Sequence, residues 1–272
     1  MCRAIETEAG GGVTVRLAWG AVTHPGTVRE RNEDSLWARP PVFVVADGLG
    51  GRAGGEVASA LAAQAFAPLE NVWPLRDSAV LATVQTAHAR IRARAAAQPE
   101  LTGMGTTLAG LALTERSGGG HGTSVETLLL FHVGDSRVYR LRDGVLRQLT
   151  RDHTAVADLL RTGAIDGAEA EWHPQRHVLS RALGTRETVR PEARRLRPQT
   201  GDRYLLCTDG LSNEVSSKVL TGLLRTGGPE AAASRLLDEA LTEGARDNVT
   251  VVVVDVLPEV DLVGLGVPAP GA

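Results

Sequence analysis

The sequence predicts an α+β fold in which an antiparallel β-sandwich is flanked by helices. Asp143 and Gly144 stand between two strand-like runs, a two-residue hairpin signal that favours antiparallel pairing. Continuous apolar runs such as VTVVVV (residues 249–254) are typical of strands covered on both faces. Two long helical segments follow one another with no strand between them, which departs from the strict strand–helix alternation of a parallel sheet.

The elements follow in chain order from these patterns. Strands are expected at residues 41–46, 106–113, 126–133, 137–149, 202–208 and 248–256. Helices are expected at residues 55–69, 78–97, 154–162 and 229–242. A Gly/Ser loop is predicted over residues 114–126, and the basic run at 190–198 is interpreted as a solvated loop. No linker divides the chain, so we expect one domain over residues 13–257, with short loose termini at 1–12 and 258–272.

Composition limits the classes of function. The 272 residues are 43% apolar and 22% charged, as in an ordinary globular protein. A net charge of -3 gives no reason to expect nucleic acid or an anionic membrane as partner. Cys2 and Cys207 are the only cysteines, so a disulfide framework is not expected. Without a signal-peptide pattern or an apolar run of about 18 residues, the sequence predicts a cytoplasmic protein with no membrane insertion.

The stretch FVVADGLGGRAGGEVASA (residues 43–60) joins a strand to a helix through a glycine-rich turn. Residues 48–53 satisfy G-x-G-x-x-G/A, which can cradle a dinucleotide. Asp47 would, however, lie against the pyrophosphate without a counter-ion, and no βαβαβ series follows. We therefore favour the other use of such a turn, which brings backbone close to a metal ion.

Four aspartates stand at strand boundaries: Asp47, Asp135, Asp209 and Asp247. A single Asp-Gly after a strand is usually a turn. Four of them can converge at one edge of a sandwich, where a divalent cation relieves their mutual repulsion. Oxygen ligands suit Mg²⁺ or Mn²⁺ rather than zinc. The histidines show no zinc-type spacing, and the following ones are interpreted as loop or surface residues: His24, His153, His173 and His177.

A fifth element lies upstream in THPGTVRERNEDSLW (residues 23–37). Taken alone, this segment is interpreted as a charged turn in which Arg29 pairs locally with Glu33 and Asp34. Beside a cluster of metal-binding aspartates, a guanidinium gains a second interpretation, because its fork matches two phosphate oxygens.

These residues and their order resemble the metal-dependent protein phosphatases of type 2C, and most of all their compact bacterial branch. The resemblance spans residues 19–256. It rests on eight ordered motifs: GTVRERNEDS, VVADGLGGRAGGEVAS, GMGTTL, HVGDSRVYRLRDG, LTRDHT, HPQRHVLSRALG, LLCTDGLSN and RDNVTVVVV. It implies a four-layer α-β-β-α sandwich of two antiparallel sheets, with the metal site at one end between them.

The resemblance also implies a set of metal ligands for two Mn²⁺ or Mg²⁺ ions. Asp47 would bridge the two ions, and Gly48 would offer its backbone carbonyl. Asp209 and Asp247 would complete the shell of the first ion, and Glu33 would act on the second through water.

The same resemblance assigns the remaining roles. Asp135 would hold a third, weaker ion together with Asp209. Asp34 would orient the attacking water, and Arg29 would bind the substrate phosphate. The segment at residues 165–184 would form a flap beside the site. One position departs from many eukaryotic relatives: Leu49 stands where they carry a histidine that is proposed to protonate the leaving oxygen, so that role is unassigned.

The implied reaction is direct hydrolysis of phosphoserine and phosphothreonine by in-line attack of a metal-bridging hydroxide, with no phosphoenzyme. The implied partners are phosphorylated proteins and a bacterial Ser/Thr kinase whose action this monomeric enzyme would oppose. Two other hypotheses stay open. One is a catalytically inactive module that binds phosphoproteins, and the other is a different phosphoester hydrolase, such as one acting on nucleotides.

Overall fold

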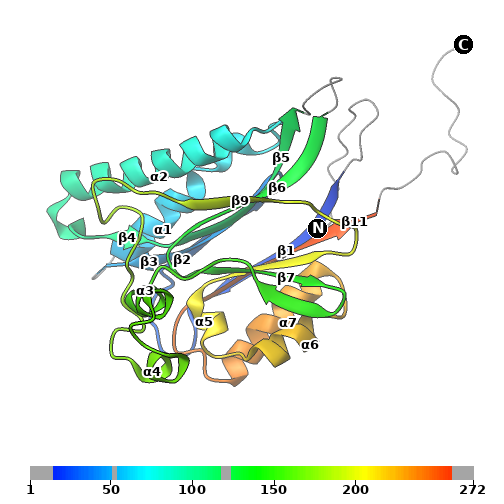
Figure 1. Cartoon of the computed structure of the whole chain (residues 1–272). Coiled ribbons are helices and arrows are strands. Elements are labelled where there is room, and N and C mark those ends of the chain that lie inside the picture. Colours follow the sequence, from blue (N-terminus) through cyan, green and yellow to red (C-terminus); the bar gives the residue numbers. More distant parts are fainter. Residues whose placement is uncertain (1–14, 51–53, 118–123, 259–272) are drawn as a thin grey trace, which may run out of the picture.

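The structure is a computed structural model that describes residues 15–50, 54–117 and 124–258. Predictions for the N-terminal leader with Cys2, for residues 51–53 of the glycine-rich turn and for nearly all of the C-terminal tail lie outside these ranges. Within them, the strands form two antiparallel sheets (Figure 1).

Sheet A has the strand order β1-β11-β10-β7-β8, and sheet B has the order β2-β3-β5-β6-β9, with β4 paired to β3 beside this path. The strand bounds are β1 (Arg16–His24), β2 (Asp34–Arg39), β3 (Val42–Leu49), β4 (Gly105–Thr106), β5 (Leu108–Ser117), β6 (Ser124–Val133), β7 (Arg137–Arg142), β8 (Val145–Gln148), β9 (Glu192–Leu196), β10 (Arg203–Cys207) and β11 (Val249–Leu257).

Helices cover the outer face of each sheet (Figure 1). The helix bounds are α1 (Gly54–Gln64), α2 (Asp77–Ala97), α3 (Ala155–Thr162), α4 (Gly167–Trp172), α5 (Asp209–Ser212), α6 (Ser217–Leu224) and α7 (Pro229–Thr242). Helix α1 packs on β2 and β3 of sheet B and is itself covered by α2, whereas α7 packs on β1 and β11 of sheet A. The predicted four-layer α-β-β-α sandwich is therefore confirmed.

Three apolar clusters lie between the four layers and pack them together. Strand β3 shows how one sequence run supplies two of them, because successive side chains point to opposite faces of a sheet. Val42 and Val44 pack toward α1 and α2, whereas Phe43 and Val45 pack between the two sheets. A strand buried on both faces needs a continuous apolar run, which is why residues 41–46 were recognisable as a strand.

The predicted hairpin is also confirmed. Strands β7 and β8 pair antiparallel, and the turn between them contains Asp143 at φ 51° and Gly144 at φ 74°. Positive φ at both turn residues matches the twist of a two-residue hairpin and favours Asp-Gly.

Several sequence predictions need correction. The basic run at 190–198 contains strand β9, which forms the edge of sheet B and keeps its charged side chains exposed. Strands β5 and β6 extend into the predicted Gly/Ser loop, with Ser117 paired to Ser124. Strands β1 and β2 and helices α4, α5 and α6 were not predicted. Helix α1 ends at Gln64 rather than at residue 69, and a short 3₁₀ turn containing Pro68 follows, because proline cannot continue an α-helix.

Candidate metal centre

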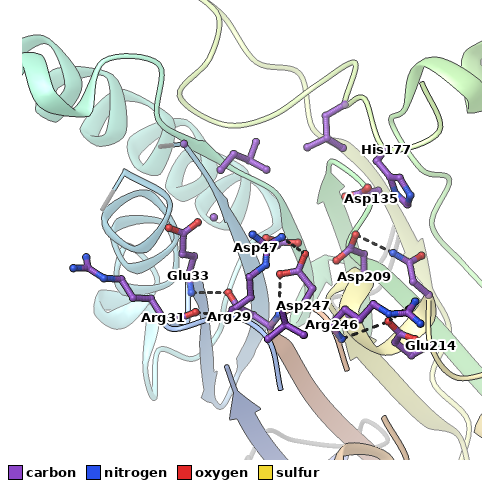
Figure 2. A pocket seen from close by; sticks show the side chains of 18 of the residues that line it. Arg29, Arg31, Glu33, Asp47, Asp135, His177, Asp209, Glu214, Arg246 and Asp247 are labelled. Atoms are coloured by element: carbon purple, nitrogen blue, oxygen red, sulfur yellow. Dashed lines mark hydrogen bonds and ion pairs between the residues drawn. The ribbon is translucent and has the colours of Figure 1, made fainter. Parts of the chain in front are cut away.

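A cavity of about 1570 Å³ is lined by the end of β3 and by loops and turns that flank strands of both sheets (Figure 2). The four aspartates singled out from the sequence, Asp47, Asp135, Asp209 and Asp247, all line it. They reach it from the end of β3, the turn after β6, the start of α5 and the residue pair before β11. The expected convergence of four separate strand boundaries at one edge of the sandwich is what the structure shows.

Asp34 is not among the residues that line the cavity, and it is more buried than the four aspartates that do, with 7% of its surface exposed. The Thr208 hydroxyl donates to its Oδ2 over 2.8 Å, whereas its Oδ1 is buried and has no hydrogen-bond partner among the described residues. Burial raises the pKa of Asp34 to about 7, and the nearby carboxylates of Asp209 and Asp247 add to that rise. One oxygen of Asp34 is thus held and the other is free to accept.

Asp47 has its pKa raised well above the usual range, first by burial and then by the negative charges of Asp34, Asp209 and Asp135. Burial also raises the pKa of Asp135 to about 7, with Asp209 as the next cause. The pKa of Asp209 is raised by burial and by Asp247, while the Asn213 amide donates to its Oδ2 over 3.0 Å. These carboxylates lie close enough to repel one another, which is the electrostatic condition that a bound cation relieves.

Two glycines bring the backbone of β3 against the start of α1. A Cβ built on Gly48 would lie 2.1 Å from the carbonyl oxygen of Gly55, and one built on Gly55 would lie 2.4 Å from Oε2 of Glu33. The amide of Gly48 donates to the backbone carbonyl of Glu33 over 3.1 Å. Burial raises the pKa of the Glu33 carboxyl, with Asp247 among the further causes. Neither glycine can be replaced without moving backbone or Glu33, since no side chain fits between them.

Two threonines brace the backbone of Asp47. Thr106 Oγ1 donates to the Asp47 carbonyl over 2.8 Å, and the Asp47 amide donates to Thr107 Oγ1 over 2.9 Å. Thr107 Oγ1 also lies 2.6 Å from the hydroxyl of Ser136, next to Asp135. The braces connect the Asp47 and Asp135 segments of the site, and both threonines belong to the GMGTTL motif.

Asn248 was not assigned a role from the sequence, although it adjoins Asp247 in the RDN motif. Its Oδ1 accepts the amide of Glu33 over 2.7 Å, and its Nδ2 donates to the carbonyls of Pro25 and Arg31 over 2.9 and 2.8 Å. Its own amide donates to Asp247 Oδ1 over 2.9 Å. Asn248 therefore positions Glu33 and Asp247 at once.

Arg29 lies at the mouth of the cavity, where its Nη2 donates to Asp247 Oδ2 over 2.8 Å (Figure 2). Both side chains are about half exposed. His177, interpreted from the sequence as a loop or surface residue, also lines the cavity, and a coulombic interaction with it lowers the pKa of Asp209. Arg176 lines the same wall. Both residues stand in the HPQRHVLSRALG motif, but their spacing in the sequence did not indicate that they line the site.

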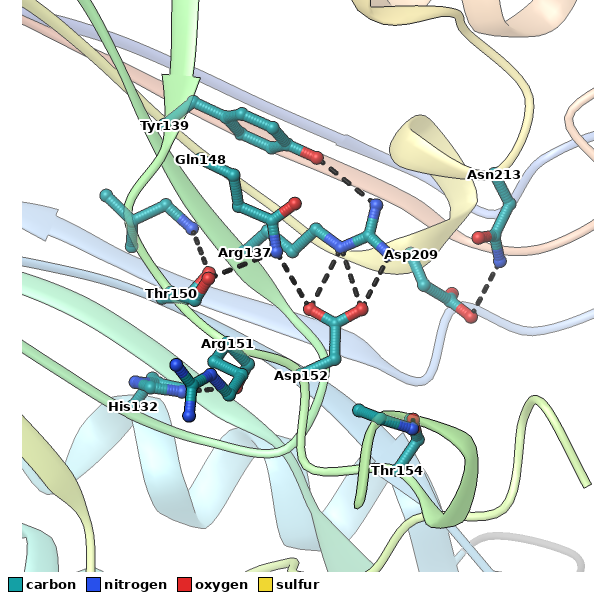
Figure 3. A network of polar contacts seen from close by, with 12 residues as sticks. His132, Arg137, Tyr139, Gln148, Thr150, Arg151, Asp152, Thr154, Asp209 and Asn213 are labelled. Atoms are coloured by element: carbon teal, nitrogen blue, oxygen red, sulfur yellow. Dashed lines mark hydrogen bonds and ion pairs between the residues drawn. The ribbon is translucent and has the colours of Figure 1, made fainter. Parts of the chain in front are cut away.

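A polar network supports the chain beside Asp209 (Figure 3). Arg137 Nε donates to both oxygens of Asp152 over 3.0 and 3.1 Å, and its Nη2 donates to Asp152 Oδ2 over 2.6 Å. The Gln148 amide donates to Asp152 Oδ1 over 3.0 Å, and Arg137 Nη1 donates to Tyr139 Oη over 3.2 Å. A fork held on two oxygens fixes orientation, so this network anchors the LTRDHT segment to β7.

His153 corrects the expectation of a surface residue, because only 4% of it is exposed. With His132 and Glu192 it forms the one group of three potential metal ligands, among the described residues, whose donor atoms all lie within 4.8 Å of one another. The amide of Gly134 donates to Nδ1 of His153, so Nε2 carries the proton and faces Glu192 Oε1 at 3.2 Å. A ring with both nitrogens engaged in this way has no free lone pair for a metal.

The residues of the main cavity fit hard divalent cations. The donors are carboxylate oxygens, which suit Mg²⁺ and Mn²⁺. The buried Oδ1 of Asp34 has no hydrogen-bond partner among the described residues, and the pKa of Asp47 is raised by its acidic neighbours. Among the described residues, no three acidic side chains bring their ligand atoms within 4.8 Å of one another.

No helix in the described part of the chain is long and apolar enough to cross a membrane. A family model described as protein phosphatase 2C matches residues 30–242. The serine/threonine protein phosphatase PstP of Mycobacterium tuberculosis is 42% identical over 247 residues, which cover 90% of this chain but only 46% of PstP. The chain therefore spans about half the length of that relative.

Two further comparisons cover nearly the whole of the matched protein. The serine/threonine phosphatase stp of Listeria monocytogenes is 34% identical over 248 residues, covering 86% of this chain and 93% of the relative. A crystal structure of the PstP catalytic domain in complex with two manganese ions matches with a TM-score of 0.79 and 40% identity, covering 90% of this chain and 100% of that one.

Proposed function

We propose that this chain, which belongs to the protein phosphatase 2C family, hydrolyses phosphoserine and phosphothreonine monoesters in proteins. The observation that carries the proposal is the convergence of five aspartates, Glu33 and Arg29 at one end of the sandwich. Carboxylates can hold hard cations, and an arginine fork can hold a phosphoryl group. A cavity that combines the two has the parts that hydrolysis of a phosphate ester requires.

We assign the residues that would hold two Mn²⁺ or Mg²⁺ ions as the family resemblance implies, and these residues line one cavity. Asp47 would hold both ions, and Gly48 would offer its backbone carbonyl. Asp209 and Asp247 would bind the first ion, and Glu33 would bind the second through water. Support comes from the raised pKa of Asp47 and from the two hydrogen bonds by which Asn248 positions Glu33 and Asp247. Asp135 would hold a third, weaker ion with Asp209, the charge that raises the pKa of Asp135 most.

When bound, such cations supply positive charge that lowers the pKa of water and balances charge on phosphate oxygens. The chain's own residues do the rest. Arg29 binds the phosphoryl oxygens after exchanging Asp247 for the substrate. Asp34, whose Oδ2 is held by Thr208 and whose Oδ1 is buried, would orient the attacking water, as the family resemblance implies. Leu49 lines the cavity and offers no proton to the leaving oxygen.

The same proposal covers the domain bounds, the oligomeric state, the location and the substrate of the protein. We take residues 13–257 as one catalytic domain that acts as a monomer in the cytoplasm on phosphorylated proteins, opposing a Ser/Thr kinase. Two curated relatives named as serine/threonine phosphatases support the substrate class.

The test is metal-dependent hydrolysis by the purified chain. With Mn²⁺ added, it should hydrolyse phosphothreonine peptides, and chelation of the metal should stop turnover. Asp47→Asn should lower kcat by at least about 100-fold and weaken Mn²⁺ binding measured by calorimetry. Asp238→Asn, an exposed aspartate on α7, is the matched control and should change neither.

The same assay separates the competing hypotheses. An inactive phosphoprotein-binding module would bind the peptide without turnover, and Asp47→Asn would then leave the measured rate unchanged. A nucleotide hydrolase would prefer nucleoside phosphates to phosphopeptides at equal concentration. Either result would contradict the proposed function.

A further inference from the structure

A second cavity, of about 280 Å³, is lined by residues between 181 and 190. This segment comes directly after Arg176, His177 and Leu179, which line the main cavity. Three of the six residues that line the second cavity are arginines, and none is acidic. The lining consists of Arg181, Ala182, Arg186, Thr188, Val189 and Arg190. We call it the arginine pocket. Three guanidinium groups around one small cavity give it a concentrated positive charge.

Two of the three arginines have no acidic partner among the described residues. In the part of the chain that the structure describes, the side chains of Arg186 and Arg190 have no hydrogen bond and no ion pair. Arg181 has an acidic partner, because its Nη1 lies 3.6 Å from Glu192 Oε1. Glu187, the acid within the segment, is exposed and does not line the pocket. Arg186 and Arg190 are themselves exposed, so their guanidinium groups are accessible to an anion from outside the described part of the chain.

Helix α2 holds the backbone of the arginine pocket in place. His88, which is 5% exposed, accepts the amide of Gly184 on Nδ1 over 3.0 Å, and its Nε2 lies 3.4 Å from the carbonyl oxygen of Glu187. Gln85 Nε2 donates to the carbonyl of Val189 over 3.2 Å, and Arg92 Nη1 donates to that of Glu187 over 3.2 Å. Four side-chain contacts thus hold the backbone of this short loop, which lowers the backbone entropy lost when a ligand binds to it.

The arginine pocket is close to the main cavity. Leu179 lines the main cavity, and Arg181, two residues later, lines the arginine pocket, so their α carbons are at most roughly 7 Å apart. Leu183 pairs with Thr106, whose hydroxyl donates to the carbonyl of Asp47. The linings of the two cavities are therefore adjacent along the chain.

We propose that the arginine pocket binds a second phosphoryl group carried by the same substrate protein, a few residues from the phosphate that is hydrolysed. This inference rests on the proposed function, because it assigns the substrate of that site. A phosphoryl dianion offers several oxygens to guanidinium forks, whereas a carboxylate offers two. The enzyme then selects protein segments phosphorylated at neighbouring positions.

The test compares three peptides that share one hydrolysable phosphothreonine. The second position carries a non-hydrolysable phosphonate, a glutamate or an unmodified serine, placed about two to six residues away on either side, because an extended residue spans about 3.3 Å. At low ionic strength, at one of these spacings, the phosphonate peptide should have a kcat/KM about tenfold above the serine peptide, since each exposed ion pair contributes modestly. Double substitution Arg186→Gln/Arg190→Gln should abolish that advantage and leave the serine peptide unchanged.

Arg147→Gln is the matched control, because Arg147 is an exposed arginine on β8 that lines neither cavity. It should keep the full advantage of the phosphonate peptide. If no spacing gives wild type a preference, or if Arg147→Gln loses as much as the double variant, the inference is overturned. An equal gain with glutamate would overturn the assignment to a phosphoryl group.

Binding separates this inference from the proposed function. Fluorescence anisotropy of a peptide with phosphonates at both positions needs no turnover, and its affinity should fall about tenfold in the double variant. Arginine-dependent binding without any hydrolysis would overturn the proposed function and retain the arginine pocket. Hydrolysis of the serine peptide with no arginine-dependent preference would do the reverse.

Discussion

Asp34 of β2 and Asp47 of β3 lie directly opposite each other in the antiparallel register. Like charges in that position destabilise a sheet, and burial raises the pKa of both carboxyls. The hydroxyl of Thr208 stabilises only one of the four oxygens. A proton or a bound cation relieves the repulsion, so the local structure is linked to pH and to metal.

The metal-free protein should lose stability as pH rises. Burial raises the folded-state pKa of Asp34 from 3.8 to about 7, so the folded chain holds this proton more tightly than the unfolded chain. The resulting stabilisation is complete below about pH 4 and is lost as pH rises through about 7. We expect the free energy of unfolding in urea, with metal chelated, to fall by a few kcal/mol from this group between those values. Mn²⁺ should restore stability at pH 7.5.

Asp34→Asn is the variant that isolates this effect. An amide keeps an oxygen that can accept the Thr208 hydroxyl and cannot ionise, so the decline of stability with pH should become shallower. A metal-free variant whose stability falls as steeply as that of wild type would show that Asp34 is not the group responsible. Asp238→Asn, far from the site on α7, should reproduce the wild-type curve.

Asn248 should prove important for metal binding although it is not a proposed ligand. Asn248→Ala removes the acceptor for the Glu33 amide and the donor to the carbonyls of Pro25 and Arg31. We expect about 2–3 kcal/mol lower stability in urea and a 10- to 100-fold weaker affinity for Mn²⁺ by calorimetry. Asn248→Asp keeps the acceptor and should retain more affinity than alanine. Equal affinity in wild type and Asn248→Ala would contradict the positioning role.

Gly48→Ala should disturb the site more than its size suggests. The added Cβ would lie 2.1 Å from the Gly55 carbonyl oxygen and 2.5 Å from that of Glu33, so backbone must move. A loss of about 1–3 kcal/mol is expected in urea unfolding, together with reduced Mn²⁺ affinity. Gly222→Ala in α6 is the control, since nothing lies within 4 Å of its added Cβ. That change should stabilise the protein by about 0.5–1 kcal/mol, and similar effects of both changes would argue against a steric requirement at Gly48.

Strands with both faces buried were the easiest part of the fold to predict. The runs of β3 and β11 are continuously apolar because each packs between a sheet and a helix layer. Strand β9 was missed for the opposite reason. It is an edge strand with exposed arginines, and charged edges protect a sheet from unwanted pairing while they resemble a loop in sequence.

The acidic residues of the site were predictable because each stands beside an apolar run. Asn248 and Thr107 were not singled out, although both stand in recognised motifs, because a single amide or hydroxyl carries no spacing signal. Their importance depends on hydrogen bonds between segments far apart in the chain: Asn248 reaches Glu33, 215 positions away, and Thr107 reaches Asp47, 60 positions away. Contacts of that kind appear only when the sheets assemble.

Arg29 should affect catalysis without affecting stability. Its side chain is 58% exposed and pairs with Asp247, which is 43% exposed, and a pair screened by solvent in this way contributes at most about 1 kcal/mol. If Arg29 binds the phosphoryl group, Arg29→Ala should lower kcat/KM for a phosphothreonine peptide by about 100-fold, because a charge-assisted fork on the transferring group is lost.

Arg29→Lys tests whether catalysis needs the two parallel donors of the guanidinium group or only its positive charge. Lysine keeps the charge but not the two parallel donors, so we expect about tenfold lower kcat/KM, between wild type and alanine. Urea unfolding of both variants should stay within about 1 kcal/mol of wild type. If Arg29→Ala keeps its kcat/KM, or loses activity only in proportion to lost stability, then Arg29 serves its ion pair with Asp247 and a different group binds the phosphate.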